Sequence, residues 1–163
     1  MITIEVDGGY RSSQRGKYRY MGIGVVVLKG TDVIFECSKY FRGGNSDICE
    51  LLAIMWGIKI ALKNGYYDAI IYTDSRSSIK LINWNTTDHE SRCRNGLVAE
   101  IHKQMCNSNL QIFWQNRSFT KRAHFLATQA LEAFRLENGI EGIEIRNGVI
   151  KSGAVRSGLK RRP

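Results

Sequence analysis

Several features are missing from this sequence, and their absence excludes some classes of protein. None of its four cysteines forms a CxxC pair, which argues against a zinc ribbon and fits small, buried thiols in a reducing compartment. No apolar run is long enough to cross a membrane. The first residues lack the basic and apolar regions of a signal peptide. We therefore expect a cytoplasmic protein without a membrane partner, and we see no internal repeat.

Acidic side chains are scarce relative to basic ones. The chain has 24 Lys and Arg against 15 Asp and Glu, which gives a formal charge of +9. This balance favours a polyanionic partner, nucleic acid above all, over the alternative that the charge only keeps the protein in solution. A length of 163 residues suits one compact domain with a sizeable core, and we expect a monomer.

The predicted secondary structure indicates an α/β fold. Apolar and β-branched runs predict strands at 2–6, 21–30, 33–41, 68–74 and 110–114, and helical periodicity predicts helices at 48–65, 77–84, 91–107 and 121–138. Residues 7–20 are rich in turn formers and basic side chains and predict a connection. Three antiparallel strands should therefore lead into a parallel half with helices on its faces.

The end of the chain differs in composition from the rest. Residues 143–151 predict a small hairpin with Asn147–Gly148 at its turn, and a basic arm follows. We therefore divide the chain into a catalytic domain, 1–138, and a basic C-terminal extension, 139–163. Whether the extension binds nucleic acid or only aids solubility stays open.

Three acids are predicted to meet at one edge of the sheet. Asp7 ends the first predicted strand, and Asp74 ends the central parallel strand, where ligands of α/β sheets bind. Glu50 lies in the first turn of the long predicted helix, which can aim it at the same place. Ala53 and Gly57 share the helix face of Glu50 and are small enough for a close approach to the sheet.

Three neighbouring carboxylates repel one another and lose hydration, which is costly without a cation. An oxygen-rich pocket of this kind suits Mg²⁺ or Mn²⁺, and two such ions can clamp the attacking water and the leaving oxygen of a phosphodiester. Taken singly, Asp7 could be a turn residue, Glu50 could favour a helix dipole and Asp74 could be a helix N-cap. Their joint position in this order of elements favours the metal site.

Four segments together resemble ribonuclease H of type 1, a member of the RNase H-like superfamily. They are IEVDGG (4–9), CELLAIMWGIKIAL (49–62), IYTDSRSSI (71–79) and FWQNRSFTKRAHFLATQAL (113–131). The resemblance covers about residues 1–135, and the motifs follow one another in the family's order. It implies the RNase H-like fold, which is a five-stranded mixed sheet of order 3-2-1-4-5 flanked by helices.

The resemblance also implies endonucleolytic hydrolysis of the RNA strand of RNA–DNA hybrids with two Mg²⁺ ions, leaving 3′-hydroxyl and 5′-phosphate ends. The implied catalytic and metal-binding residues are Asp7, Glu50, Asp74 and His124, the last at a position where most members have Asp. A neutral imidazole can ligate a divalent ion, and a nitrogen ligand suits Mn²⁺ better than Mg²⁺. We therefore expect Mn²⁺ to substitute and to be relatively favoured. The alternative is that His124 inactivates the site.

Nucleic-acid contacts are implied around the same site. Asn45 and Ser46 stand where the family has an Asn pair, and contact with the RNA 2′-hydroxyl would distinguish RNA from DNA. Ser75, at a helix start, could hold a phosphate. Further contacts are expected from Gly8, Gly9, Arg76, Arg117 and Lys121. Trp114, in contrast, is expected to pack in the core.

Two other functions stay open on the sequence alone. One is a catalytically weak hybrid- or RNA-binding module that keeps the fold, and the other is a related nuclease such as a junction resolvase. Cleavage of RNA only when it is paired with DNA, tight binding without cleavage, and cleavage of a DNA junction would distinguish the three.

Overall fold

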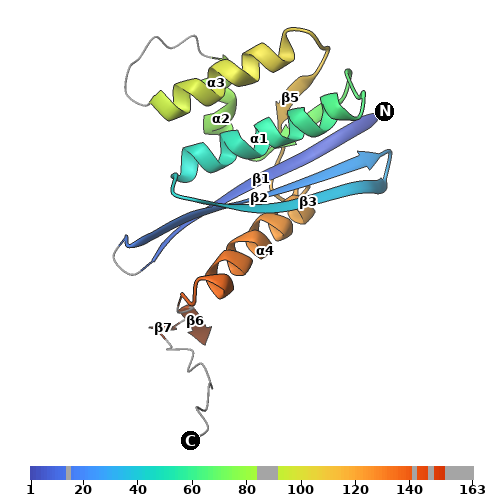
Figure 1. The fold of residues 1–163 in the computed structure, drawn as a ribbon. Helices are drawn as coiled ribbons and strands as arrows, with labels where there is room; N and C mark the ends of the chain where they lie inside the picture. The colour runs from blue at the N-terminus through green and yellow to red at the C-terminus, as the bar shows by residue number, and fades with distance from the viewer. Residues whose placement is uncertain (14–15, 84–91, 141–142, 147–148, 153–163) are drawn as a thin grey trace, which may run out of the picture.

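The computed structural model of the chain describes residues 1–13, 16–83, 92–140, 143–146 and 149–152 (Figure 1). The elements are β1 (Ile2–Ser13), β2 (Tyr18–Lys29), β3 (Asp32–Arg42), α1 (Ser46–Lys63), β4 (Ile70–Thr73), α2 (Arg76–Asn83), α3 (Arg92–Met105), β5 (Gln111–Trp114), α4 (Lys121–Glu137), β6 (Ile143–Arg146) and β7 (Val149–Ser152). None of the helices in this described part is both long and apolar enough to span a bilayer.

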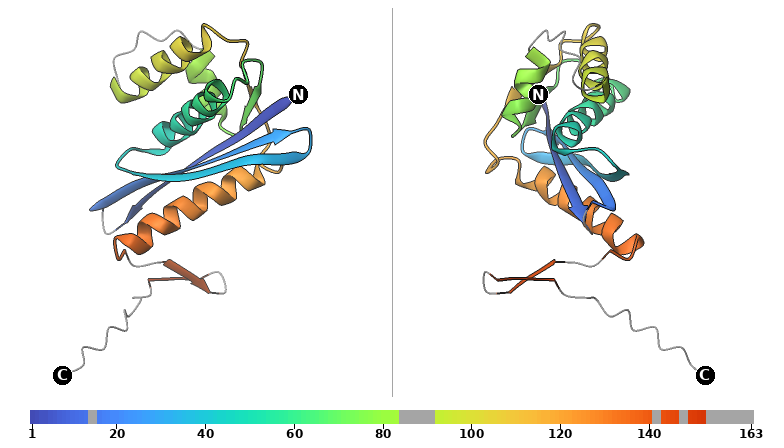
Figure 2. Two further views of the ribbon diagram at one scale, coloured as in Figure 1. Left: turned by 45° about the vertical axis from the view of Figure 1, so that its right-hand side comes forward. Right: turned by 90° about the vertical axis from the view of Figure 1, so that its left-hand side faces the viewer.

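The main sheet has five strands in the order β3-β2-β1-β4-β5, as the sequence predicted. β1, β2 and β3 pair antiparallel, whereas β4 pairs parallel to β1 and β5 parallel to β4. Helices α1 and α3 cover one face, and α4 crosses the other face beneath β1, β2 and β3 (Figures 1 and 2). The mixed sheet between helical layers is therefore the predicted α/β architecture.

Apolar side chains fill both faces of the sheet. The main core lies between the sheet and α1, where Ile4, Val6, Ile58 and Ile71 are fully buried. On the opposite face, Tyr20 of β2 stacks on a ring of α4, Phe134, with centroids 4.5 Å apart. Burial of apolar surface contributes about 25 cal/mol per Å² to the stability of the fold. The main core therefore fixes α1 against one face of the sheet, and the stack of Tyr20 on Phe134 fixes α4 against the other.

Glycines let both helices come close to the sheet. A Cβ on Gly57 of α1 would lie 2.9 Å from Val6 Cγ1, which confirms the close approach expected at this position. A Cβ on Gly24 of β2 would lie 2.0 Å from the carbonyl oxygen of Ala123 in α4. No real Cβ tolerates such a distance from backbone, so α4 depends on this glycine for its position.

The prediction that residues 7–20 form a turn-rich connection is wrong. β1 runs on to Ser13 and pairs there with Tyr18 of β2, so Asp7 lies inside a long strand and does not end it. Gly8 and Gly9 serve packing and not a turn, whereas Gly16, with a φ of 85°, lies in the turn before β2. A Cβ on Gly9, for example, would lie 2.7 Å from Leu131 Cδ1 of α4.

Other boundaries differ by a few residues. α1 begins at Ser46, two residues before the predicted start, which moves Glu50 from the first turn into the second. β6 and β7 form the predicted hairpin, with Ile143 opposite Ser152, and Figure 2 shows it beyond the end of α4. The predicted turn at Asn147–Gly148 and the basic arm from residue 153 lie outside the described residues. The division of the chain at residue 138 stays a prediction.

We predict that Gly57→Ala lowers the free energy of unfolding by about 1–3 kcal/mol, because the new methyl group overlaps Val6 and pushes α1 from the sheet. Gly96→Ala is the matched control, since a Cβ there meets nothing within 4 Å on α3. It should leave stability unchanged or raise it by up to about 1 kcal/mol. Urea denaturation of both variants measures the difference, and equal midpoints would contradict the close approach.

Candidate active site

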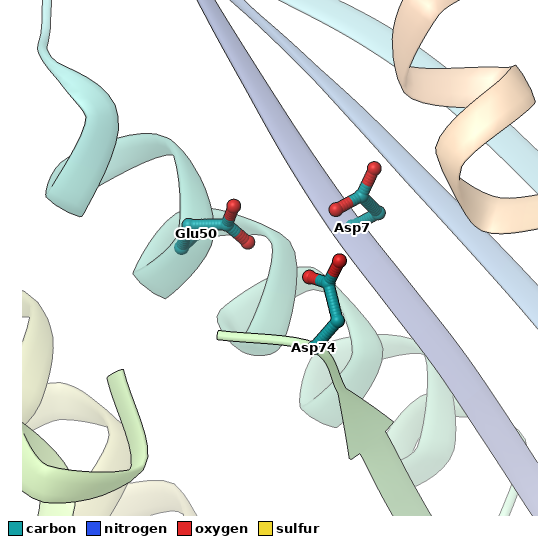
Figure 3. A group of neighbouring side chains, drawn as sticks. All are labelled: Asp7, Glu50 and Asp74. Atoms are coloured by element: carbon teal, nitrogen blue, oxygen red, sulfur yellow. The ribbon is translucent and has the colours of Figure 1, made fainter. Parts of the chain in front are cut away.

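Strand pairing brings Asp7 and Asp74 together. The last residue pair between β1 and β4 is Val6 with Thr73, so each aspartate is the next residue after the same pair. Glu50 reaches this place from α1, as Figure 3 shows. The three acids predicted to converge therefore do so, although they come from the middle of a strand, a helix and the end of a strand.

The three carboxylates lie within reach of one ion. One ligand oxygen from each of Asp7, Glu50 and Asp74 lies within 4.8 Å of the other two. Asp7 is 1% exposed, whereas the side chain of Asp74 is 14% exposed. The backbone N–H of Gly8 donates to Glu50 Oε2 at 3.3 Å. Gly8 also has to be glycine, because a Cβ would lie 2.5 Å from the carbonyl oxygen of Cys49.

Burial and mutual repulsion raise the pKa values of two of these acids. Burial, together with the charges of Asp7 and Asp74, raises the pKa of Glu50 to about 8. Burial also raises the pKa of Asp7 to about 6, although its hydrogen bond with His124 opposes the rise. A divalent cation would remove this cost of ionisation, and carboxylate oxygens are the ligands that Mg²⁺ and Mn²⁺ prefer. The residues present therefore fit such an ion.

His124 adjoins the acids from α4. Its Nδ1 lies 2.7 Å from Asp7 Oδ2 and also 2.7 Å from Nη2 of Arg117. Since Nδ1 carries either a proton or a lone pair, it can donate to Asp7 or accept from Arg117, but it cannot do both. The lone-pair form could ligate a cation, and the role of His124 as fourth ligand stays a prediction.

Arg117 brings a positive charge to the opening of the site. Its Nε lies 3.5 Å from Asp74 Oδ2, and its side chain is 60% exposed. The guanidinium therefore joins Asp74 to His124 on the solvent side of the cluster. It offsets part of the negative charge and stays accessible to an incoming phosphate.

The turn after β4 answers whether Asp74 is a helix cap. The cap of α2 is Ser75, whose Oγ accepts the backbone N–H of Ser78 at 3.2 Å. Ser75 Oγ also lies 2.8 Å from Ser78 Oγ, and Ser75 is buried. The Asp74 carboxylate is thus not used as a helix cap and faces the other two acids and Arg117. The hydroxyl of Ser75 is engaged within the helix start, and its contact with a phosphate stays a prediction.

The other predicted contact residues lie around the acids. Asn45 caps α1, with its Oδ1 accepting the N–H of Ile48 at 2.9 Å, and both Asn45 and Ser46 are exposed. Arg76 and Lys121 are exposed at the first positions of α2 and α4. Gly9 packs against α4 and Gly8 packs against α1, so both glycines serve close packing. Their contacts with nucleic acid stay a prediction.

Trp114 is the site residue that sequence reasoning missed. It was expected in the core, yet it is 39% exposed at the end of β5. Its indole N–H donates to the carbonyl oxygen of Asp74 at 3.1 Å. The signal that could have found it is register, because Trp114 pairs with Thr73 and so ends β5 beside Asp74.

The fold and the acid cluster define an RNase H-like protein, and comparison with known proteins agrees. A family model described as reverse transcriptase-like matches residues 5–130. The chain therefore belongs to the reverse transcriptase-like family. No curated protein sequence matches it.

Solved structures of RNase H domains share the fold. The N-terminal RNase H domain of a Mycobacterium tuberculosis protein matches with a TM-score of 0.72 and 22% identity, over 84% of this chain and 97% of that one. RNase H1 from Halobacterium salinarum matches with a TM-score of 0.68 and 20% identity, over 81% of this chain and 98% of that one. LC11-RNase H1, in complex with an RNA/DNA hybrid, matches with a TM-score of 0.65 and 19% identity, over 82% of this chain and 99% of that one. The expected RNase H-like fold is thus confirmed.

We predict that the metal-free protein loses stability as the pH rises from 5 to 8. The unfolded carboxyls of Asp7 and Glu50 ionise near pH 4, whereas in the fold their pKa values are about 6 and about 8. The folded state therefore holds protons that the unfolded state has released, and unfolding becomes easier across this window. The loss should be on the order of 5 kcal/mol, seen as a falling melting temperature in EDTA.

Two variants and one addition make this test specific. Glu50→Gln should flatten the decline between pH 6 and 8, whereas Glu36→Gln, at an exposed carboxylate paired with Arg122, should not. Mn²⁺ added at pH 8 should restore the melting temperature of the wild type, because it binds the ionised cluster. A metal-free protein with a flat profile would contradict the mutual repulsion.

Proposed function

We propose that this protein is a metal-dependent endonuclease that hydrolyses the RNA strand of RNA–DNA hybrids. The observation that carries the proposal is the convergence of Asp7, Glu50 and Asp74, with one ligand oxygen from each within 4.8 Å of the others. Further support comes from the shared fold and from LC11-RNase H1, which is bound to an RNA/DNA hybrid.

Two ions of Mg²⁺ or Mn²⁺ would be held by the three acids and His124. When bound, they supply the positive charge that stabilises in-line attack of water on the phosphodiester, leaving 3′-hydroxyl and 5′-phosphate ends. The protein's own contribution is placement. Asp7 is fixed inside a strand paired with β2, and Glu50 is held by the Gly8 N–H. Such preorganisation avoids reorganisation costs at the moment of reaction.

Recognition of the hybrid is assigned to exposed groups beside the acids. Asn45 and Ser46 lie at the start of α1, one turn before Glu50, where their polar atoms can meet a 2′-hydroxyl. Arg76, Arg117 and Lys121 would contact phosphates, and the formal charge of +9 favours a polyanion. Binding of this kind should weaken as salt rises.

We predict cleavage of a labelled RNA strand in an RNA–DNA hybrid when Mg²⁺ or Mn²⁺ is present. Asp74→Asn should lower the rate by about 10³-fold or more, because it removes a charged ligand from the cluster. Asp68→Asn, at an exposed aspartate before β4, is the matched control and should cleave like the wild type. Denaturing gels of the end-labelled strand give the rate and the product ends.

Other substrates test the competing functions in the same assay. Tight hybrid binding without cleavage in either metal would replace the proposal by a binding module. Cleavage of a four-way DNA junction in preference to the hybrid would favour a resolvase. Equal activity of Asp74→Asn and the wild type would show that the acid cluster is not the active site.

We predict that His124→Asp shifts the metal preference toward Mg²⁺. A fourth carboxylate adds negative charge and replaces a nitrogen ligand by oxygen, and Mg²⁺ gains more from both changes than Mn²⁺ does. The ratio of the hybrid cleavage rate in Mn²⁺ to that in Mg²⁺ should fall about tenfold, or roughly 1.4 kcal/mol. An unchanged ratio would show that His124 does not contact the metal.

A further inference from the structure

We propose that Trp114 is a positioning residue for this site, with two separable parts. Its indole N–H fixes the backbone that carries Asp74, and its ring face holds the guanidinium of Arg76, two residues further along the chain. The inference rests on the proposed function, since it assigns these parts within the same nuclease site. The motifs that resemble ribonuclease H account for the acids and give no role to this contact.

The first part is a set of hydrogen bonds to the backbone on both sides of Asp74. Trp114 Nε1–H donates to the Asp74 carbonyl oxygen at 3.1 Å. The N–H of Gln115 donates to the carbonyl oxygen of Thr73 at 2.8 Å, and the N–H of Ser75 donates to Thr73 Oγ1 at 3.1 Å. The backbone is therefore held before and after Asp74, and this determines where its carboxylate points.

Such restraint is needed because Asp74 has a free direction in which to move. It follows the last residue of β4, so no ladder pairing holds it, whereas Asp7 stays paired with Gly24 of β2. Repulsion from Asp7 and Glu50 drives its carboxylate outward, toward solvent. The indole N–H of Trp114, at the end of β5, restrains the Asp74 backbone against this movement. An exposed fraction of 39% shows that core packing is not the main role of the ring.

The second part is the stacked arginine. The guanidinium carbon of Arg76 lies 4.1 Å from the Trp114 ring centroid, within the range of a cation–π contact. Arg76 is the first residue of α2 and is exposed. Within the described part of the chain, the ion pairs do not include Arg76. The ring therefore orients a charge that is left for a substrate phosphate.

The two parts predict different effects of three variants. Trp114→Phe keeps a ring under Arg76 but loses the N–H. It should lower kcat for hybrid cleavage about tenfold, with KM nearly unchanged. It should also raise the midpoint of a Mn²⁺ titration, measured through the melting temperature, at least about threefold. Arg76→Gln should raise KM and reduce by about one the slope of log affinity for the hybrid against log salt, without moving the Mn²⁺ midpoint. Trp114→Leu should show both effects.

Trp56→Phe is the matched control, because this tryptophan packs between Lys39 and Lys59 away from the acids. It should change neither readout. Hybrid binding is measured by fluorescence anisotropy in EDTA, so that it does not depend on cleavage. If the wild type fails to cut the hybrid while the Mn²⁺ midpoint still shifts in Trp114→Phe, the proposed function fails and the positioning of Asp74 stands. If Trp114→Phe has the same kcat and the same Mn²⁺ midpoint as the wild type, the N–H part of the proposal is wrong. An unchanged salt slope in Trp114→Leu would overturn the ring part.

Discussion

The repulsion among three neighbouring carboxylates, one buried and two half-buried, is the constraint on which the rest of this structure depends. One ligand oxygen from each of Asp7, Glu50 and Asp74 lies within 4.8 Å of the others, and burial together with the charges of the two aspartates raises the pKa of Glu50 to about 8. A chain free to relax would separate these groups. The surrounding structure therefore has to hold each acid from its own direction, and it does so mainly with backbone.

The three acids are held by different means. Asp7 is carried by a strand that continues on both sides, Glu50 by a helix that reaches the sheet through Gly57, and Asp74 by hydrogen bonds to the turn after β4. His124 and Arg117 approach from the solvent side and are partly exposed. The site thus combines an acidic cluster held mainly by backbone with a more exposed, basic side formed by Arg117 and His124.

Much of this arrangement could be predicted from the sequence, for physical reasons. Helical periodicity over 48–65 and the short apolar run before Asp74 are direct consequences of burial, and their order restricts the sheet topology to few choices. The fold and the three acids followed from these patterns together with the motifs. Glycine is where prediction failed, because the sequence DGG signals a turn equally well when Gly8 and Gly9 serve helix packing.

Side-chain roles that depend on register were also beyond the sequence. Trp114 looks like any aromatic residue of an apolar strand, and only its pairing with Thr73 places the indole beside Asp74. The role of Asp74 was similarly ambiguous, since it could have capped α2 in place of Ser75. The hydrogen bond from Ser78 to Ser75 decides between them, and it is a property of the folded turn.

The distribution of the site over four elements has a consequence for the protein's biosynthesis. The contact between His124 and Asp7 joins residues 117 positions apart, so it forms only after α4 has left the ribosome and docked beneath the sheet. Closing so long a loop costs conformational entropy before the contact repays it, which makes this step slow. A nascent or clipped chain that lacks α4 would carry all three acids but not the contact of His124 with Asp7.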